Sequence, residues 1–371
     1  MLRRPLLYLH AFILLTLQFC LAQSHESQIQ ALLDSTLAAN PQAVGIMVHV
    51  EAPDLQLSFS SAAGNVKKDS NLRLKPLQPV LIASNTKTVV AAAILRLAEM
   101  KKLQLDEAIA PFLHKKTSAA LLARGYPLES ITLIHLLSHT SGITDYVNDA
   151  YFDSVDTQPQ KQWTRDEQIE LAITVTDTLV EPGKTFSYGD INYLLLTEVI
   201  ETCTGKPFWK VIPELLNFSA NNINAMWFVN LEEAPADALP LAHQYWETRG
   251  WDSYNLNPSW DLHGGGGQAA TTKDLAVFFQ QLFTEQIVRD SVLLKRMYTL
   301  VLPKSKSIYC LGLRKISFDG YEAYYHGGFW GTDAMYLPKL NMTIAAFTLE
   351  KDQRNHNADL SKRIIKLLTK P

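Results

Sequence analysis

Hydrophobic and polar residues alternate near both ends of the chain, whereas most of the middle has apolar residues at helical spacing. Residues 26–40 carry apolar side chains at intervals that share one helix face, and residues 44–50 and 55–59 then alternate. The N-terminal part is therefore predicted to form a helix followed by a β-hairpin across Pro53-Asp54.

The C-terminal part returns to the strand pattern. Asp319-Gly320 supplies residue types that accept the positive φ values of a two-residue hairpin turn, so the strands on either side are expected to pair. An amphipathic helix closes the chain at residues 358–369. The four strands predicted in this part are residues 309–318, 322–326, 332–337 and 343–349, and the helices predicted before them are residues 89–101, 134–138, 193–203 and 273–283.

Strands at both ends of a chain with a helical middle are typical of an α+β fold. We expect one antiparallel sheet, formed by residues of about 43–64 and 309–349, with flanking helices and a helical lobe beside it. Residues 23–371 would then form a single domain. The cleft between sheet and lobe is the natural place for a binding or catalytic site.

Composition narrows the functional classes. The 371 residues are 47% hydrophobic, enough for a large core, and 34 basic against 37 acidic residues give a net charge of −3. Nucleic-acid binding needs a basic stripe, which the chain lacks, so no nucleic-acid partner is expected.

The N-terminus resembles a secretory signal peptide. Arg3 and Arg4 precede the apolar residues 5–19, and a stretch ending in Ala22 supplies small residues for cleavage. The alternative is a membrane anchor, but the apolar stretch is short for a span of about 20 residues. We expect residues 1–22 to be removed, leaving a periplasmic or secreted protein without a stable membrane anchor. Cys203 and Cys310 would remain, either paired or as separate thiols.

The first candidate catalytic residue is Ser84. It starts the segment Ser84-Asn85-Thr86-Lys87, which opens the helix predicted at residues 89–101. Residues three apart share a helix face, so the Ser84 hydroxyl and the Lys87 amine can come within hydrogen-bond reach. A lysine whose pKa is lowered by burial and positive surroundings can take the serine proton. By itself the spacing favours the simpler alternative, a serine that caps the helix beside a solvated lysine.

Two later segments add to this signal. Tyr188 lies on a turn before an apolar helix, where its phenol can project into a cleft. His326-Gly327-Gly328 ends a predicted strand, and glycines there allow a ligand backbone to approach closely.

Together these residues resemble the three motifs of the serine beta-lactamase and penicillin-binding-protein superfamily. The order is Ser-x-x-Lys at Ser84 and Lys87, a tyrosine motif at Tyr188, and a basic residue followed by glycine at His326. The chain is most similar to the branch of class C beta-lactamases, D-Ala-D-Ala carboxypeptidases, D-aminopeptidases and related esterases. Residues 131–143 and 265–275 carry further stretches of the same kind, including Leu136-Leu137-Ser138-His139-Thr140-Ser141-Gly142.

The resemblance implies an acyl-enzyme mechanism without metal or cofactor. Ser84 would be the acylated nucleophile, Lys87 its base, and Tyr188 the group that passes protons to the leaving group and the deacylating water. His326 would steady the tyrosine and the substrate. Gly327, Gly328 and Phe329 would border the substrate, with the backbone N–H groups of Ser84 and Phe329 forming an oxyanion hole.

Asp190 departs from the family pattern, which has asparagine at this position. A carboxylate cannot donate a hydrogen bond to a substrate amide oxygen, and beside Lys87 it favours the charged amine. We therefore expect a small ester or a D-amino-acid-containing peptide as substrate, of a kind that avoids the missing donor or presents a cation to Asp190. The alternatives are a catalytically silent binding or sensor domain that keeps the pocket, and a weak beta-lactamase.

Two other patterns were weighed against this site. His135 and His139 are four residues apart on a predicted helix and could share a metal, but no Glu follows in a His-Glu-x-x-His pattern and no third ligand is evident. The glycines at residues 264–267 predict a flexible turn rather than a phosphate-binding loop. Substrate specificity is expected from the loops at residues 148–164 and 232–258.

Overall fold

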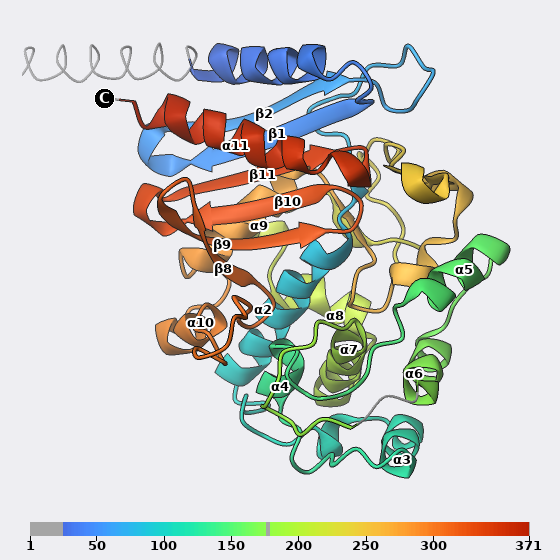
Figure 1. The fold of residues 1–371 in the computed structure, drawn as a ribbon. Helices are drawn as coiled ribbons and strands as arrows, with labels where there is room; N and C mark the ends of the chain where they lie inside the picture. The colour runs from blue at the N-terminus through green and yellow to red at the C-terminus, as the bar shows by residue number, and fades with distance from the viewer. Residues whose placement is uncertain (1–24, 176–178, 371) are drawn as a thin grey trace, which may run out of the picture.

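The structure is a computed structural model that describes residues 25–175 and 179–370; the predicted signal segment, residues 1–22, lies outside these ranges. Within them, six strands form one antiparallel sheet in the order β2-β1-β11-β10-β9-β8, with strands from both ends of the chain (Figure 1). The predicted α+β fold is confirmed. The strands are β1 (Gly45–Ala52), β2 (Leu57–Gly64), β8 (Arg314–Phe318), β9 (Tyr321–Gly328), β10 (Thr332–Leu337) and β11 (Met342–Thr348).

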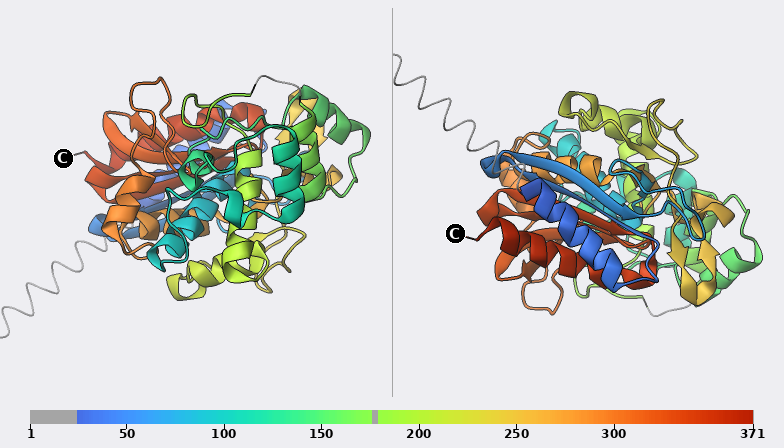
Figure 2. Two further views of the ribbon diagram at one scale, coloured as in Figure 1. Left: turned by 90° about the horizontal axis from the view of Figure 1, so that it is seen from below. Right: turned by 90° about the horizontal axis from the view of Figure 1, so that it is seen from above.

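Two helices from opposite ends of the chain cover one face of this sheet. Residues 25–39 are helical and lie beside α11 (Asn355–Leu368) over the strands, as Figure 2 shows from above. Ile29 and Leu33 of the first helix pack with Leu360 of the second against alternate side chains of β1 and β11. Burial of such apolar faces holds the two termini together in one layer.

The other face of the sheet packs on α9 (Thr272–Phe283), and the helical lobe lies beyond it. The lobe is built around α2 (Thr86–Glu99), where all residues from Thr86 to Leu95 are buried. Three alanines at its centre (residues 91–93) leave room for α7 to approach, as the contacts between the two helices show. The remaining helices are α3 (Lys115–Ala123), α4 (Leu133–Leu137), α5 (Asp149–Thr157), α6 (Arg165–Thr174), α7 (Ile191–Thr204), α8 (Phe208–Leu215) and α10 (Ser291–Met297).

A small second sheet links the two parts. β3 (Val80–Leu81) pairs with β7 (Gln268–Ala270), which also pairs with β4 (Met226–Phe228). The Ile82 N–H continues this pairing by donating to the Gln268 carbonyl at 2.9 Å. This sheet fixes the segment just before Ser84 against the glycine-rich turn at residues 264–267.

The prediction of a strand at residues 309–318 is wrong for residues 309–313. β8 begins only at Arg314, because Gly312 has a φ of 74° and its backbone turns away from the sheet toward α2. The Thr88 hydroxyl donates to the Gly312 carbonyl at 2.7 Å, and the Gly312 N–H donates to the Leu137 carbonyl. Residues 309–313 therefore join the site region instead of lengthening the sheet.

The helix predicted at residues 134–138 also does not carry the two histidines as a pair. α4 ends at Leu137, and His139 lies beyond it with a φ of 56°. The His135 Nδ1 accepts a hydrogen bond from the Thr132 N–H at the start of this helix. Among the described residues no group of three His, Cys, Asp or Glu side chains is placed to hold a metal ion.

Two further expectations concern cysteines and membranes. Cys203 and Cys310 are free thiols, and Cys310 is fully buried, so the two do not form a disulfide. No helix within residues 25–175 and 179–370 combines the length and apolarity needed to cross a bilayer.

Gly312 offers a test of this packing. In Gly312→Ala the added methyl group would lie 2.4 Å from the Ala91 Cβ at a left-handed φ. We expect the free energy of unfolding to fall by about 2–5 kcal/mol, from backbone strain and overpacking together. Urea unfolding followed by fluorescence measures this loss. The matched control is Gly320→Ala, whose φ of 85° is also left-handed but whose Cβ has no described atom within 4 Å. Its loss should stay at about 1–2 kcal/mol, and equal losses in the two variants would contradict the account.

Candidate active site

Ser84 lies at the junction of the small sheet and α2. It belongs to a 3-10 turn, η2 (Ala83–Asn85), and is partly exposed although both of its neighbours are buried. Ala83 has a φ of 44°, a left-handed value that costs a non-glycine residue energy and that clusters at functional sites. The strained turn is held by Asn85, whose amide donates to the Thr332 hydroxyl at 3.0 Å and to the Ile82 carbonyl at 3.2 Å.

Lys87 lies one helical turn beyond Ser84 and is fully buried. Its ammonium donates to Ser84 Oγ at 3.0 Å and to the Gly265 carbonyl at 2.5 Å, and it forms an ion pair with Asp190 at 2.6 Å. The predicted contact between the Ser84 hydroxyl and the Lys87 amine is therefore present. The Gly265 carbonyl accepts a hydrogen bond from Lys87, so the glycine-rich turn helps to hold the lysine as well as connecting two elements.

Three carboxylates surround this lysine. Burial alone would lower the pKa of Lys87, but the charges of Asp190, Tyr188 and Asp261 outweigh it and raise the pKa above its ordinary value. Burial also raises the pKa of Asp145, to about 7, and raises that of Asp261 well above its usual range, and repulsion from Asp190 adds to both effects. Lys87 is therefore an ammonium at neutral pH, paired with the Asp190 carboxylate, whereas the raised pKa values of Asp145 and Asp261 favour the protonated forms of these two groups.

The carboxylates come from three separate segments. Asp190 immediately precedes α7, and Asp145 accepts the Ile191 N–H at 3.1 Å at the start of the same helix. Asp261 ends a 3-10 turn, η7 (Pro258–Asp261). Glycines allow these close approaches, since a Cβ on Gly265 would lie 2.8 Å from Asp190 Cγ and one on Gly266 only 2.3 Å from Asp261 Oδ2.

Tyr188 reaches the same centre. Lys87 Nζ lies 4.9 Å from the centre of its ring, and Lys87 and Ser84 are close enough to the phenol to act on its pKa. Burial raises the pKa of Tyr188, and the positive charge of Lys87 opposes that rise. The ring is supported by His139 at a centroid distance of 4.3 Å. The structure thus brings Tyr188 next to Lys87, which is itself bonded to Ser84 and Asp190.

Tyr309 lies between His326 and this group. Burial holds the pKa of His326 well below the ordinary value, with Lys87 and Arg314 adding to the effect, so the imidazole is neutral. Its Nδ1 bonds the Gly327 carbonyl at 3.0 Å and must carry the proton, which leaves Nε2 to accept from the Tyr309 hydroxyl at 2.9 Å. Tyr309 in turn packs edge-on against Tyr188 at 5.8 Å. His326 therefore contacts Tyr309 rather than Tyr188.

The two glycines after His326 are required by packing within the protein. A Cβ on Gly328 would lie 2.1 Å from the Ile82 carbonyl, and one on Gly327 would lie 1.3 Å from an Arg354 nitrogen. The close approaches predicted for a ligand are thus taken by the protein's own groups. Gly328 lets the end of β9 approach the Ile82 carbonyl, just before Ser84, and Gly327 leaves room for Arg354.

Phe329 is part of an aromatic wall. Its ring packs at 5.2 Å against both Trp246 and Trp260, and at 6.0 Å against Phe152. Phe329, Trp246 and Phe152 are each partly exposed, whereas Trp260 is buried. Phe152 and Trp246 belong to the two loop regions from which specificity was expected.

Several residues of the site were missed from the sequence. Tyr309 was assigned to a strand, His139 to a helix, and Asp145 and Asp261 were not singled out. The available signals were their positions: Asp145 follows the Leu-Leu-Ser-His-Thr-Ser-Gly stretch, and Asp261 stands just before the glycine-rich turn. Arg314 was missed as well; its guanidinium lies 6.0 Å from the centre of the Tyr188 ring.

Solved structures share this architecture. A D-stereospecific amidohydrolase from Streptomyces sp. matches with a TM-score of 0.74 at 22% identity, over 92% of this chain and 97% of that one. The D-amino acid amidase from Ochrobactrum anthropi SV3, complexed with L-phenylalanine amide, also gives a TM-score of 0.74, at 20% identity over 93% and 98% of the two chains. At these identities the likeness establishes the fold.

Sequence comparisons give the family. Protein flp of Staphylococcus aureus (strain COL) is 31% identical over 144 residues, which are 39% of this chain and 27% of that protein, so the match covers only about a quarter of the relative's length. The family model described as Beta-lactamase matches residues 35–367, nearly the whole described chain. The chain belongs to the beta-lactamase family.

Proposed function

We propose that the chain is a serine hydrolase that acylates Ser84 with a small ester, or with an amide or peptide of a D-amino acid whose amino group is free. The observation that carries this proposal is the contact between Ser84 and Lys87 within a ring of three carboxylates. Membership of the beta-lactamase family supports hydrolysis. The predicted signal segment would bring the enzyme to such substrates outside the cytosol.

The proton path follows the contacts around Ser84. Ser84 Oγ attacks the substrate carbonyl as its proton passes to Lys87, and the oxyanion is held by the backbone N–H groups of Ser84 and Phe329. Tyr188 then gives its phenolic proton to the leaving group and regains one from Lys87. Water attacks the acyl-enzyme by the reverse route, releasing the acid and Ser84.

Lys87 can act as the base only after losing a proton, and the carboxylates around it oppose that loss. A positive charge on the substrate, placed near Asp190 and Asp261, would offset them and lower the pKa of Lys87. A substrate ammonium group would also stabilise the ionised forms of Asp145 and Asp261, whose pKa values are raised, so the site favours a substrate with a free ammonium group. The aromatic wall at Phe329 and Trp246 offers a surface for an apolar side chain of that substrate.

Asp190 also affects which bond is cleaved. As a carboxylate paired with Lys87 it cannot donate to an acyl-amide oxygen, which disfavours beta-lactams and N-acylated substrates. D-Amino-acid amides and esters with a free amine have no such acyl amide. The neighbouring amidase was solved with an amino acid amide, which is consistent with this substrate class.

The nucleophile is tested by labelling. A fluorophosphonate should modify Ser84, and Ser84→Ala should reduce labelling at least about a thousandfold because the attacking oxygen is gone. Intact-mass analysis and peptide mapping measure the modification. The control is Ser60→Ala, since Ser60 Oγ contacts His49 Nδ1 at 2.7 Å and so also has a basic group beside its hydroxyl. Labelling at Ser60, or none at Ser84, would refute the proposal; the second result would instead favour a silent binding domain.

The base is tested through Asp190→Asn. Because the Asp190 carboxylate raises the pKa of Lys87, the acylation rate of the unmodified enzyme should climb with pH into the alkaline range. Removing that charge lowers the pKa of Lys87, so the rise should move to lower pH and acylation at pH 7 should become faster. Stopped-flow labelling across pH 5–11 measures both profiles. Superimposable profiles would show that Lys87 is not the base.

The substrate charge is tested with D-phenylalanine p-nitroanilide and its N-acetyl derivative. Removal of the ammonium charge should lower kcat/KM by at least about tenfold, the loss of one charge-assisted contact. In Asp261→Asn this preference should shrink, whereas in Asp166→Asn, a surface carboxylate paired with Lys116, it should persist. Equal rates for both compounds with the unmodified enzyme would exclude ammonium recognition.

A further inference from the structure

Tyr188 stands on a segment without regular structure of its own. Residues 185–189 belong to neither a helix nor a strand, and α7 begins only at Ile191. In the proposed mechanism Tyr188 gives its proton to the leaving group, and a displacement of about 1 Å at such a group can cost about a hundredfold in rate. The position of the phenol must therefore be set by contacts with other parts of the chain.

His139 contacts this segment on both sides of Tyr188. Its carbonyl accepts the Ser187 N–H at 2.9 Å, and its Nδ1 accepts the Gly189 N–H at 3.3 Å. Its ring packs on the Tyr188 ring, with centroids 4.3 Å apart and an angle of 39° between the planes. One residue therefore holds the residue before Tyr188, the residue after it, and the phenol ring itself.

The imidazole of His139 is neutral, with its proton on Nε2. The Asn192 amide nitrogen donates to Nδ1 at 3.3 Å, while its amide oxygen accepts the Ser141 hydroxyl at 2.6 Å. Nδ1 thus accepts from both Gly189 and Asn192 and carries no hydrogen. Burial lowers the pKa of His139 well below its ordinary value, and the charge of Lys87 adds to this effect. A neutral ring adds no second positive charge next to Lys87.

Two features of His139 cost free energy. Its φ of 56° is a left-handed value, which is unfavourable for a non-glycine residue and clusters at functional sites. Its Nε2 is buried and has no hydrogen-bond partner among the described residues. An apolar side chain would avoid the second cost but would leave the Gly189 N–H without this acceptor. The acceptor beside Tyr188 therefore explains why a histidine suits this position.

We propose that His139 is a positioning residue for Tyr188, which holds the phenol where it can protonate the leaving group. This role rests on the proposed function, in which the carbon–nitrogen bond of the substrate breaks as the phenolic proton moves to the departing nitrogen, and Lys87 returns a proton to the phenolate. His139 exchanges no proton in this step. It acts through Tyr188 rather than on the substrate.

Two substrates separate positioning from a merely structural role. The nitrogen of D-phenylalanine p-nitroanilide must gain a proton to leave, whereas the p-nitrophenyl ester of D-phenylalanine releases a stable anion that needs none. The ratio of the two kcat/KM values, each of which covers acylation, therefore measures how well Tyr188 supplies its proton. A general loss of folded protein would lower both values alike and leave the ratio unchanged.

His139→Phe keeps a ring against Tyr188 but removes the Nδ1 acceptor. It should lower kcat/KM for the anilide at least about tenfold more than for the ester. His139→Asn can accept near the same place and tolerates a left-handed φ, but it lacks the ring. It should shift the ratio several-fold, less than His139→Phe, and it supplies the test if His139→Phe folds poorly.

A double variant shows whether His139 acts through the phenol. Tyr188→Phe alone should shift the ratio in the same direction, because the proton donor is gone. Adding His139→Phe should then change the ratio by less than about twofold, since the group that His139 positions is absent and the two effects are not additive.

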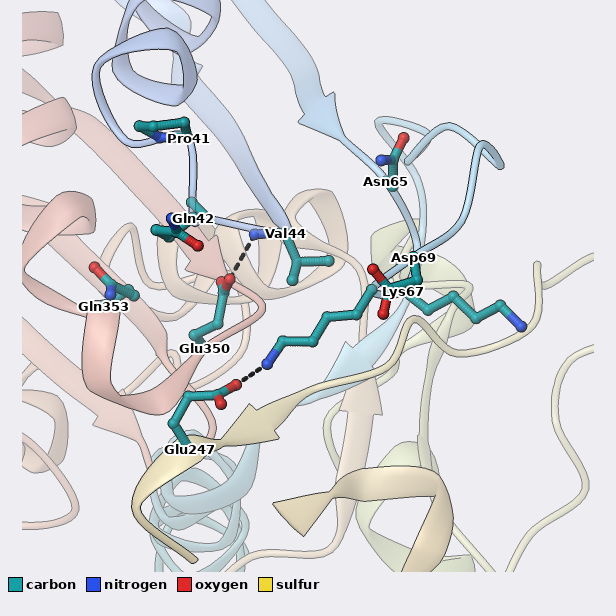
Figure 3. A pocket seen from close by; sticks show the side chains of 11 residues that line it. Pro41, Gln42, Val44, Asn65, Lys67, Asp69, Glu247, Glu350 and Gln353 are labelled. Carbon is teal, nitrogen blue, oxygen red and sulfur yellow. Dashed lines mark hydrogen bonds and ion pairs between the residues drawn. The ribbon is translucent and has the colours of Figure 1, made fainter. Parts of the chain in front are cut away.

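Glu350→Leu is the matched control for loss of a buried acceptor. Glu350 is only 3% exposed, and its Oε1 accepts the Val44 N–H at 2.5 Å, beside a cavity of about 490 Å³ at the end of the main sheet (Figure 3). The residues that line this cavity include none of those proposed for catalysis. The variant should lose stability in urea unfolding but keep the ratio within about twofold of that of the unmodified enzyme.

An unchanged ratio in the His139 variants that fold, an equal shift in Glu350→Leu, or full additivity of His139→Phe and Tyr188→Phe would overturn the positioning role. If the unmodified protein turned over neither compound, or if turnover survived in Ser84→Ala, the proposed function would fall and this role with it. Turnover that requires Ser84 but shows an unchanged ratio would overturn the positioning role alone.

Discussion

The buried ion pair between Lys87 and Asp190 is the interaction on which the site depends. It joins the start of α2, which carries Ser84, to the start of α7, and the Gly265 carbonyl adds the glycine-rich turn to the same ammonium. A lysine with no exposure is tolerated only when its charge is paired and its N–H groups are bonded. The requirement to satisfy this one charge therefore fixes three distant segments of the chain around Ser84.

That arrangement has a cost for catalysis. The Asp190 carboxylate, which allows Lys87 to be buried, also keeps it protonated, so in the proposed mechanism the substrate would have to contribute to its activation. A positive charge near Asp190 and Asp261 would provide that contribution, and it would also stabilise the ionised form of Asp261, whose pKa burial has raised. The proposal therefore couples substrate binding to activation of the base through the same group of charges.

Much of this site could be predicted from local sequence. The contact between Ser84 and Lys87 follows from helical geometry, and Tyr188 and Asp190 follow from motif order. The alternation of apolar and polar residues at both ends of the chain predicted the strands of the main sheet. In contrast, the positions of Asp261 near Lys87 and of Tyr309 near Tyr188 depend on tertiary packing. No periodic pattern in the sequence predicts such contacts. Gly312 broke a predicted strand for the same reason, since its backbone is drawn toward α2.

The protonation state of Lys87 tests the central claim most directly. A ¹⁵N NMR titration of the lysine side chains, with Lys87 assigned by Lys87→Arg, reports when its nitrogen loses a proton. The account predicts that Lys87 remains an ammonium beyond pH 10.5, its ordinary pKa, because Asp190 and the other carboxylates outweigh burial. A neutral amine at pH 7 in the unliganded protein would contradict it.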